Sequence, residues 1–353
     1  MAIRHWAQEL VPQIGKLERD TVSANFIDRL IRGAIAKGAS RPRLLSAIHV
    51  RDASLRNPVG RMARLVLVHL FEAIERELGD RSAAMQLAAA ARPQCFSDLG
   101  FIAFFAPTVG DMVATTVDIQ QFRQNIWRTS FERDGDPACI VWTLPDDDVG
   151  NLDSAIEFSL ASYAHLYRHS LPSRLVPLGA QFRHQPRFAA GHYEQLLGCP
   201  VSFGAEANAI LLDAKMLKLA SPNANPTLQQ RLLQVYQQPV AWLAEGYRHR
   251  AFSYLYLASE LNKSPLTLDR LAASFGLSER TLRRKLVEED SAFRTLLEKV
   301  RRDLCGLYAM EARRSLKDVA ELLGYSELSA FTRAYRRWHG RPPSESWSSD
   351  GAD

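Results

Sequence analysis

Three arginines lie close together in the last hundred residues, at a spacing that places them on one face of a helix. Arg280, Arg283 and Arg284 stand at positions i, i+3 and i+4, whereas Leu282 and Leu286 fall on the opposite side. A guanidinium group can donate two parallel hydrogen bonds to guanine in the major groove of DNA, so an exposed row of arginines suits base recognition. An ordinary solvated helix face shows the same pattern. The elements around this helix indicate whether the arginines bind DNA or only face solvent.

These arginines follow a short motif that occurs twice. Residues 271–278 contain an apolar residue, Ala, two variable residues, an aromatic or aliphatic residue, Gly, another apolar residue and Ser, and the same order returns 48 residues later over 319–326. In a helix-turn-helix unit the small Ala lets two helices approach, Gly takes the left-handed turn, the next residue fills the core and Ser caps the second helix. The repeat therefore predicts helix-turn-helix units over about 267–289 and 315–338.

The second copy also separates two faces, with Phe331, Ala334 and Tyr335 on the apolar side. Its outward side carries polar and basic residues, namely Ser329, Thr332, Arg333 and Arg336. Between the copies, residues 291–311 have no proline, begin with Ser291 and show apolar residues at helical spacing, which predicts one connecting helix. About 21 residues at about 1.5 Å each give roughly 31 Å, close to one turn of DNA.

The charge of the chain favours the same region. The formal net charge is +5 over 353 residues, and residues 264–343 contain 16 Lys and Arg against 11 Asp and Glu, which is again +5. The basic excess is thus local, as expected for a part that meets a polyanion.

Other chemistry finds little support in the sequence. The four cysteines, Cys95, Cys139, Cys199 and Cys305, form no C-x-x-C pair, so we expect reduced thiols in a cytoplasmic protein. His165 and His169 have a zinc-compatible spacing but no evident third ligand. Phosphate-binding loops, nucleophile elbows, an export signal and membrane-spanning segments are not apparent. We expect no metal, no cofactor, no membrane association and no enzymatic activity.

The part before the repeat mixes helices and strands. Helical periodicity runs from Val22 to about Leu78 and is clearest from Met62, while Asp134-Gly135 inside residues 122–144 signals a β-hairpin. The further expected elements are helices over 153–169 and 191–197 and strands over 176–182, 201–203 and 209–212. We predict an α+β domain over 1–240, a linker over 241–249 and an all-α domain with two helix-turn-helix units over 250–348.

The runs 267–304 and 315–347 together resemble the DNA-binding domain of the AraC/XylS family over essentially its full length. In the second copy the segment from the turn glycine, Gly324, to the core aromatic, Phe331, is one residue longer than the segment from Gly276 to Leu282 in the first copy. That family has the same extra residue in its second copy. The resemblance implies base contacts by Arg280, Arg283, Arg284, Ser329 and Arg333. We assign Arg336 and Arg337 to phosphates, and Ser278 and Ser326 complete the predicted DNA-binding set.

The N-terminal part resembles the effector-binding domain of the subgroup that includes the arginine and ornithine regulators, through residues 182–188 and 192–217. This implies a transcription factor that responds to a small molecule, with double-stranded DNA, RNA polymerase and a second copy of the chain as partners. Aromatic residues suited to lining an apolar pocket are Phe105, Trp127, Phe131, Trp142 and Tyr163. Two alternatives stay open: a regulator without a ligand, and an alkyl-transfer repair enzyme that uses a cysteine thiolate.

Overall fold

The computed structural model describes residues 20–57, 60–89, 102–120, 123–133, 136–144, 151–170, 176–262, 265–308 and 315–346. Its contacts divide the chain into two compact units, Met1–Gln229 and Gln230–Asp353, here called the N-terminal unit and the C-terminal unit. Within the described ranges, no helix is both long enough and apolar enough to cross a membrane.

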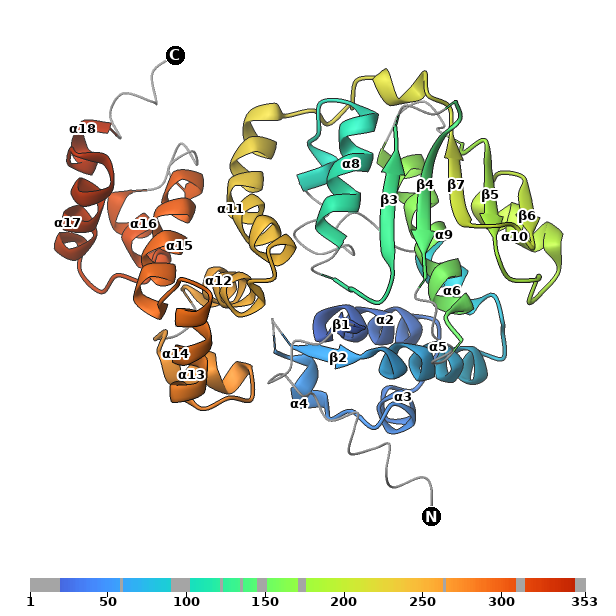
Figure 1. The fold of residues 1–353 in the computed structure, drawn as a ribbon, viewed down its shortest axis with the longest axis horizontal. Coiled ribbons are helices and arrows are strands. Elements are labelled where there is room, and N and C mark those ends of the chain that lie inside the picture. The colour runs from blue at the N-terminus through green and yellow to red at the C-terminus, as the bar shows by residue number, and fades with distance from the viewer. Residues whose placement is uncertain are drawn as a thin grey trace. The chain divides into compact units, whose positions relative to one another are not determined.

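The N-terminal unit begins with a layer of helices and one small sheet (Figure 1). Its elements are β1 (Thr21–Ser23), α2 (Ala24–Ala36), α3 (Arg41–Ala47), α4 (Asp52–Leu55), β2 (Arg61–Ala63), α5 (Arg64–Leu78) and α6 (Ala83–Ala89). The prediction of continuous helical structure from Val22 was wrong at two places, because β1 and β2 pair antiparallel with Val22 opposite Met62. The predicted end of α5 is confirmed: Gly79 takes the left-handed conformation, with φ of +63°.

The second layer of this unit is a mixed five-stranded sheet flanked by helices (Figure 1). Its elements are α8 (Val109–Ile119), β3 (Arg128–Glu132), β4 (Ala138–Thr143), α9 (Asp153–Ser170), β5 (Gly179–Phe182), α10 (Ala190–Leu197), β6 (Val201–Phe203), β7 (Asn208–Leu212) and the 3-10 helix η3 (Met216–Lys218). The strand order is β3-β4-β7-β5-β6, in which only β5 and β6 run parallel. The predicted hairpin is confirmed, with Thr129 opposite Trp142, although its turn at Asp134-Gly135 lies outside the described residues.

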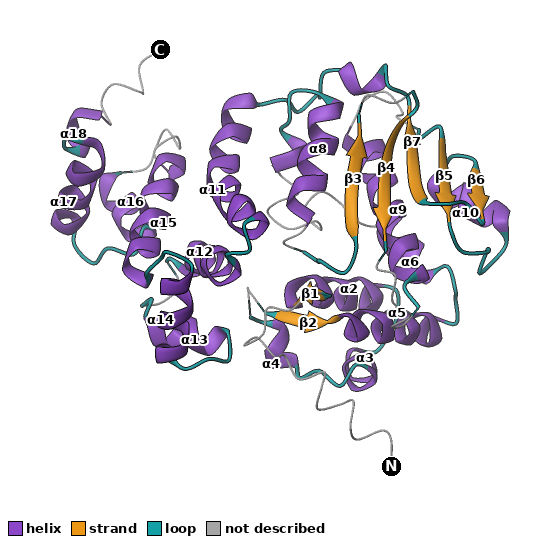
Figure 2. Ribbon diagram, in the orientation of Figure 1, coloured by secondary structure: helices purple, strands orange, loops and turns teal. Residues whose placement is uncertain are grey.

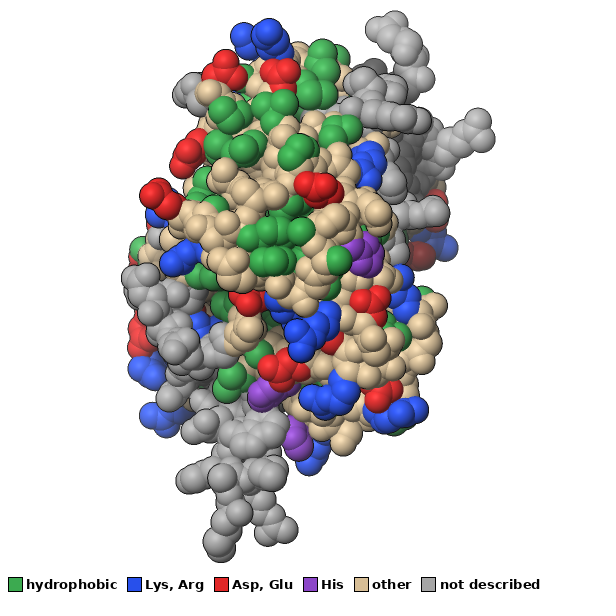
Figure 3. Space-filling model, turned by 90° about the vertical axis from the view of Figure 1, so that its right-hand side faces the viewer, with side chains coloured by type: hydrophobic (Ala, Val, Ile, Leu, Met, Phe, Trp, Pro, Cys, Tyr) green, Lys and Arg blue, Asp and Glu red, His purple; other side chains and the backbone are tan. Residues whose placement is uncertain are grey.

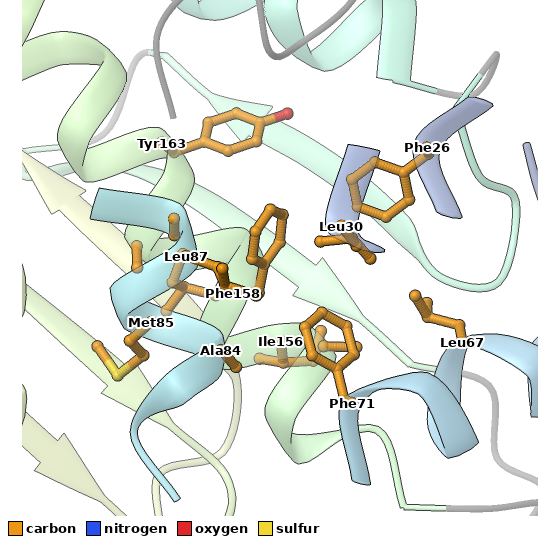
Figure 4. Packing of buried hydrophobic residues seen from close by; sticks show 14 of the residues in the cluster. Phe26, Leu30, Leu67, Phe71, Ala84, Met85, Leu87, Ile156, Phe158 and Tyr163 are labelled. Carbon is orange, nitrogen blue, oxygen red and sulfur yellow. The ribbon is translucent and has the colours of Figure 1, made fainter. Parts of the chain in front are cut away.

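Helix α9 joins the two layers through their common hydrophobic core. Figure 4 shows Phe158 of α9 pointing between side chains of α2 and α5. Its ring centroid lies 5.7 Å from that of Phe26 and 5.7 Å from that of Phe71. Leu87 of α6 lies near it in Figure 4, and Met85 of the same helix is also buried. Because the core is continuous across the helices and the sheet, the N-terminal unit is one α+β domain, as predicted.

The surface of this unit differs between the two layers. Figure 3 shows one face, on which hydrophobic side chains gather mainly in the upper half and charged side chains are denser below. Exposed large hydrophobic residues of the unit include Val176 and Leu178, which precede β5. Such scattered exposure is ordinary for a folded protein and by itself identifies no partner.

The C-terminal unit contains only helices and loops among its described residues (Figure 2). These helices are α11 (Pro226–Ala244), α12 (Arg248–Glu260), α13 (Leu268–Ser274), α14 (Glu279–Glu288), α15 (Phe293–Tyr308), α16 (Leu316–Leu322), α17 (Leu328–His339) and α18 (Pro343–Ser346), the first beginning four residues before the unit boundary. The all-α prediction is confirmed for this part of the chain.

The chain passes from one unit to the next inside a helix. The division falls at Gln229, within α11 and about ten residues before the predicted linker over 241–249. The residues of that predicted linker form the end of α11, a turn in which Gly246 has φ of +89°, and the start of α12. Pro239 lies inside α11, although proline usually interrupts a helix.

Candidate nucleic-acid interface

The first helix-turn-helix unit consists of α13, a turn at Gly276 and α14. Thr267 caps α13 by accepting a hydrogen bond from the backbone N–H of Arg270, and Ser278 caps α14 in the same way through Thr281. Gly276 has φ of +63°, which a side chain would strain. These features match the motif as read from the sequence, so the local geometry of the first unit was predictable.

Helix α14 presents its basic residues to solvent. Leu282 and Leu286 are buried, while Arg280, Arg283 and Arg284 are all exposed. Two of the arginines form ion pairs within the helix: Arg283 lies 3.7 Å from Glu279, and Arg284 lies 2.7 Å from Glu288. Exposed pairs of this kind are weak, at about 0.3–0.5 kcal/mol, so both guanidinium groups can exchange their partner for a phosphate or a base.

The second unit repeats this arrangement with α16 and α17. Ser315 and Asp318 form a reciprocal capping box at the start of α16. Gly324 has φ of +70°, and a Cβ atom there would lie 2.8 Å from the carbonyl oxygen of Leu261. The turn therefore requires glycine for its backbone conformation and for its close approach to the end of α12.

The predicted cap of α17 was wrong by one residue. The N-cap is Glu327, which makes no side-chain capping hydrogen bond, and Ser326 precedes it in the turn. The extra residue of the second copy explains the shift, because it lengthens the turn before α17 begins. Ser326 is nevertheless exposed beside the start of this helix.

The outward face of α17 carries the remaining predicted contacts. Phe331 and Tyr335 are buried, and Ser329, Arg333 and Arg336 are exposed. All nine residues predicted to bind DNA thus lie on the second helices of the two units or in the turns before them: Ser278, Arg280, Arg283, Arg284, Ser326, Ser329, Arg333, Arg336 and Arg337.

Arg337 differs from the others because it binds another helix of the same unit. It pairs with Glu298 of α15, and the indole N–H of Trp338 donates to the same carboxylate at 3.1 Å. The hydrogen bond from Arg337 is the main reason that the pKa of Glu298 lies below its usual value. Arg337 therefore holds α17 against α15, while 62% of its side-chain surface stays accessible.

Helix α15 connects the two helix-turn-helix units and orients the second of them. It begins at Phe293, two residues later than expected, and its described part ends at Tyr308, so it spans roughly 24 Å. Arg301 on this helix donates to the carbonyl oxygens of Leu323 at 3.0 Å and Gly324 at 2.9 Å. Its guanidinium also lies 4.3 Å from the centre of the Tyr325 ring. These contacts fix the second turn to the connecting helix.

The sequence did not reveal Arg301 or the residues that attach α12. Helix α12 packs against α15, where the hydroxyl of Tyr254 donates to Asp303 at 2.7 Å. At its other end the carboxylate of Glu289 accepts hydrogen bonds from the backbone N–H groups of His249 and Arg250. Because these partners are about 40 to 50 residues apart in sequence, no local motif reports them.

The N-terminal unit contains a cavity of about 550 Å³ between the end of α8 and the adjoining ends of β3 and β4. Its lining residues are Val117, Asp118, Gln120, Gln124, Asn125, Ile126, Trp127, Arg128, Thr129, Thr143 and Leu144. The side chains of Gln124 and Asn125 hold the surrounding loop through hydrogen bonds to backbone groups. The indole nitrogen of Trp127 and the hydroxyl of Thr129 are buried in this wall and form no hydrogen bond with the described residues.

Of the five aromatic residues predicted to line a ligand pocket, Trp127 alone borders this cavity. Trp142 and Tyr163 are fully buried and pack edge to face at 5.2 Å, and the indole of Trp142 donates to Ser159 at 3.0 Å. Phe131 packs partly buried against the core, and the ring of Phe105 contacts that of Phe104. The structure therefore places the other four in hydrophobic packing.

A buried charged cluster in the N-terminal unit was not predicted as a site. Arg187, from the segment 182–188, binds Glu75 at 2.7 Å and Glu157 at 3.0 Å. Glu157 also accepts a hydrogen bond from the hydroxyl of Tyr193 at 2.5 Å, and the ring of His184 lies 3.7 Å away. Burial raises the pKa of Glu157 to about 7 despite the hydrogen bonds and the positive charge that act against it. The cluster ties α5, α9 and α10 together.

The described cysteines lie wholly or partly out of contact with water. Burial raises the pKa of Cys139, that of Cys199 to about 11 and that of Cys305 to about 12, so these thiols stay protonated at neutral pH. Cys95 lies outside the described ranges. Within those ranges, His, Cys, Asp and Glu side chains form no group of three able to hold a metal ion.

Comparisons with known proteins match both units. Residues 38–221, more than half of the chain, match the family described as the arabinose-binding domain of AraC transcription regulator, N-terminal, and residues 271–346 match a helix-turn-helix domain family. The HTH-type transcriptional regulator VqsM of Pseudomonas aeruginosa is 30% identical over 159 residues, which is 43% of this chain and 47% of VqsM. The chain thus spans about half the length of that relative.

A further relative and a solved structure match nearly the whole chain at lower identity. The ornithine utilization regulator of Pseudomonas aeruginosa is 22% identical over 330 residues, or 92% of this chain and 96% of that protein. The crystal structure of the transcriptional regulator CdpR from the same organism covers 95% of this chain and 100% of its own, with 18% identity and a TM-score of 0.44.

Proposed function

The chain belongs to the AraC family of transcription regulators, and on that premise we propose that it binds specific DNA sites and regulates transcription in response to a small molecule. The observation that carries the proposal is the pair of helix-turn-helix units, each with exposed basic residues on its second helix. The second helices of the two units, α14 and α17, can enter successive major grooves of DNA.

Within this proposal the nine predicted residues fall into two groups, one that contacts bases and one that contacts phosphates. Arg280, Arg283, Arg284 and Arg333 donate hydrogen bonds to guanine, and Ser329 reads either base type. Ser278, Ser326, Arg336 and Arg337 contact the phosphate backbone, which positions the protein without reading sequence. The DNA-binding domain occupies 250–348, preceded by a linker at 241–249.

The effector domain occupies residues 1–240, and we assign its ligand to the cavity beside Trp127. The wall of this cavity carries the polar side chains of Asp118, Gln120 and Arg128, which can hydrogen-bond a small ligand. Val117, Ile126 and Leu144 supply apolar contact surface in the same wall. The size of the cavity suits a small metabolite. The relationship to the ornithine utilization regulator over most of the chain supports a metabolic effector.

Regulation by such a protein involves further partners. We propose a cytoplasmic homodimer that acts through RNA polymerase, and a function in binding rather than catalysis. The raised pKa values of the described cysteines argue against the alkyl-transfer alternative, which requires a thiolate. A ligand-independent regulator remains the second candidate, and the effector experiment separates the two.

The DNA part of the proposal is tested by incubating the full-length chain with a pool of random duplexes and sequencing the bound fraction. We expect enrichment of a common sequence by the wild type and loss of part of that sequence with the triple variant Arg280→Ala, Arg283→Ala, Arg284→Ala. Bound duplexes without any shared sequence would refute specific recognition.

The effector part is tested by thermal unfolding of the full-length chain against a set of metabolites. A ligand at about 100 times its dissociation constant adds about 2.7 kcal/mol of stability. We expect Trp127→Phe or Thr129→Val, which change the cavity wall, to reduce the response, and Ser130→Ala to leave it unchanged because Ser130 is not among the residues that line the cavity. A response that both cavity variants retain would exclude this cavity as the site.

A further inference from the structure

Two large hydrophobic side chains are exposed among the described residues of the C-terminal unit, and each lies on the second helix of a helix-turn-helix unit. Val287 is 64% exposed near the end of α14, and Leu328 is 42% exposed as the first residue of α17. All other large apolar residues of the two units are buried or partly covered. These exposed aliphatic side chains contribute little to the stability of the fold. We therefore ask whether they contact a binding partner.

Of Leu328 and Val287, Leu328 is better placed to contact the bases of DNA. In helix-turn-helix proteins the N-terminal residues of the second helix contact the base edges. Side chains on a helix tilt toward its N-terminus, so Leu328 reaches beyond the end of α17 that would enter the groove. Counting back three residues from the buried core residue, the equivalent position in the first unit is Glu279, which is polar. The two units therefore differ in chemistry at this position.

The chemistry of the DNA major groove narrows what a leucine can recognise there. Hydrogen-bond donors and acceptors cover most of its floor, and the C5-methyl group of thymine is the apolar group that the four base pairs display. Ser329, Arg333 and Arg336 are exposed on the same helix and make its outward surface polar and basic, suited to an anionic partner. Leu328 cannot form side-chain hydrogen bonds, so any sequence preference it confers must come from apolar contact.

We propose that Leu328 is a specificity-determining residue of the second unit and packs against the C5-methyl group of a thymine in the operator. This rests on the proposed function, because it requires α17 to lie in the major groove. Contact with one methyl group is worth about fourfold in affinity, the equivalent of about 0.8 kcal/mol. Val287 lies at the opposite end of its helix and makes no such contact.

The experiment uses the full-length chain and the duplex selected from the random pool. Each thymine is replaced in turn by deoxyuridine, which lacks the methyl group but keeps the same hydrogen-bonding groups. The part of the duplex read by α17 is identified first, as the base pairs at which Arg333→Ala changes the preference. Dissociation constants are then measured for the wild type, Leu328→Ala and the matched variant Val287→Ala.

The wild type and Val287→Ala are expected to lose about fourfold in affinity at one thymine of the part read by α17. Leu328→Ala is expected to bind the thymine and deoxyuridine duplexes equally. The proposal is overturned if no thymine in that part shows a methyl dependence in the wild type, or if Leu328→Ala retains it. Failure of the selection itself would instead count against the proposed function.

Discussion

His249 and Glu289 are joined by two hydrogen bonds that connect the start of α12 with the end of α14. The Glu289 carboxylate accepts from the backbone N–H of His249 at 3.2 Å and from its ring Nδ1 at 2.7 Å. The same carboxylate accepts from the backbone N–H of Arg250 at 2.7 Å. Tyr247, the N-cap of α12, provides no side-chain cap, so Glu289 satisfies the free N–H groups from across the fold.

Replacing Glu289 by Ala should destabilise the C-terminal unit by about 1 to 3 kcal/mol, because half-buried donors lose their acceptor. Chemical unfolding of the full-length chain measures the change. The neighbouring Glu288→Ala is the control, since its exposed pair with Arg284 is worth little, and it should shift stability by less than about 0.5 kcal/mol. Equal effects of the two substitutions would show that the Glu289 contacts do not stabilise this junction.

Replacing Arg301 by Met should weaken DNA binding although we place this residue in no DNA contact. The substitution removes the two hydrogen bonds to Leu323 and Gly324 and the contact with Tyr325, which fix the turn before α17. We expect a loss of about tenfold, corresponding to about 1.4 kcal/mol. The control is Arg302→Met on the same helix, whose ion pair with Asp303 is long, at 4.0 Å. If both variants bind as the wild type does, Arg301 is not needed to orient α17.

Arg284 and Arg336 should have different effects on sequence preference. Arg284→Ala is expected to relax the preference at one base pair and to cost about 1–3 kcal/mol there. Arg336→Ala should weaken binding to all sequences alike and reduce the slope of log affinity against log salt by about one. Selection on randomised operators and a salt titration measure both effects. The reverse pattern would exchange the assignments of the two residues.

The buried cluster around Glu157 should make the stability of the N-terminal unit depend on pH. The folded pKa of about 7 lies above the ordinary 4.5, so the protonated form favours folding. This contribution is fully present below about pH 4.5 and is lost as the pH rises through 7. Relative to Glu157→Gln, the wild type should therefore lose up to about 3 kcal/mol between pH 5 and pH 8. Thermal unfolding of both proteins across this range measures the difference, and parallel curves would contradict the assignment.

Local sequence signals were sufficient for the elements whose geometry depends on a few neighbouring residues. Gly276 and Gly324 identified both turns because their left-handed backbone favours glycine, and the alternating residues beside Asp134-Gly135 identified the β3–β4 hairpin. Contacts between distant segments were not predictable in this way. Arg301 binds carbonyl groups 22 and 23 residues away, and Arg187 binds Glu75 across 112 residues. One residue of difference in a turn was also enough to move a helix cap from Ser326 to Glu327.

The aromatic residues show that the ligand site, too, could not be predicted from local sequence signals. Trp127 and Trp142 both belong to the β3–β4 region and have equal apolar character. Nevertheless Trp142 packs on Tyr163 with its N–H bound to Ser159, whereas Trp127 borders the cavity. The difference arises from the tertiary position of each ring and from the partners of its indole nitrogen, neither of which follows from composition or periodicity.

The proposed function places α14 and α17 in successive major grooves of one operator. Protection of guanine N7 from methylation, measured with the full-length chain on the selected duplex, tests it most directly because N7 lies in the major groove. We predict two protected clusters about one helical turn, or about 10 base pairs, apart on the same face. The first should disappear with Arg283→Ala, Arg284→Ala and the second with Arg333→Ala. A single cluster, or two clusters that both variants leave intact, would show that α14 and α17 do not bind successive major grooves.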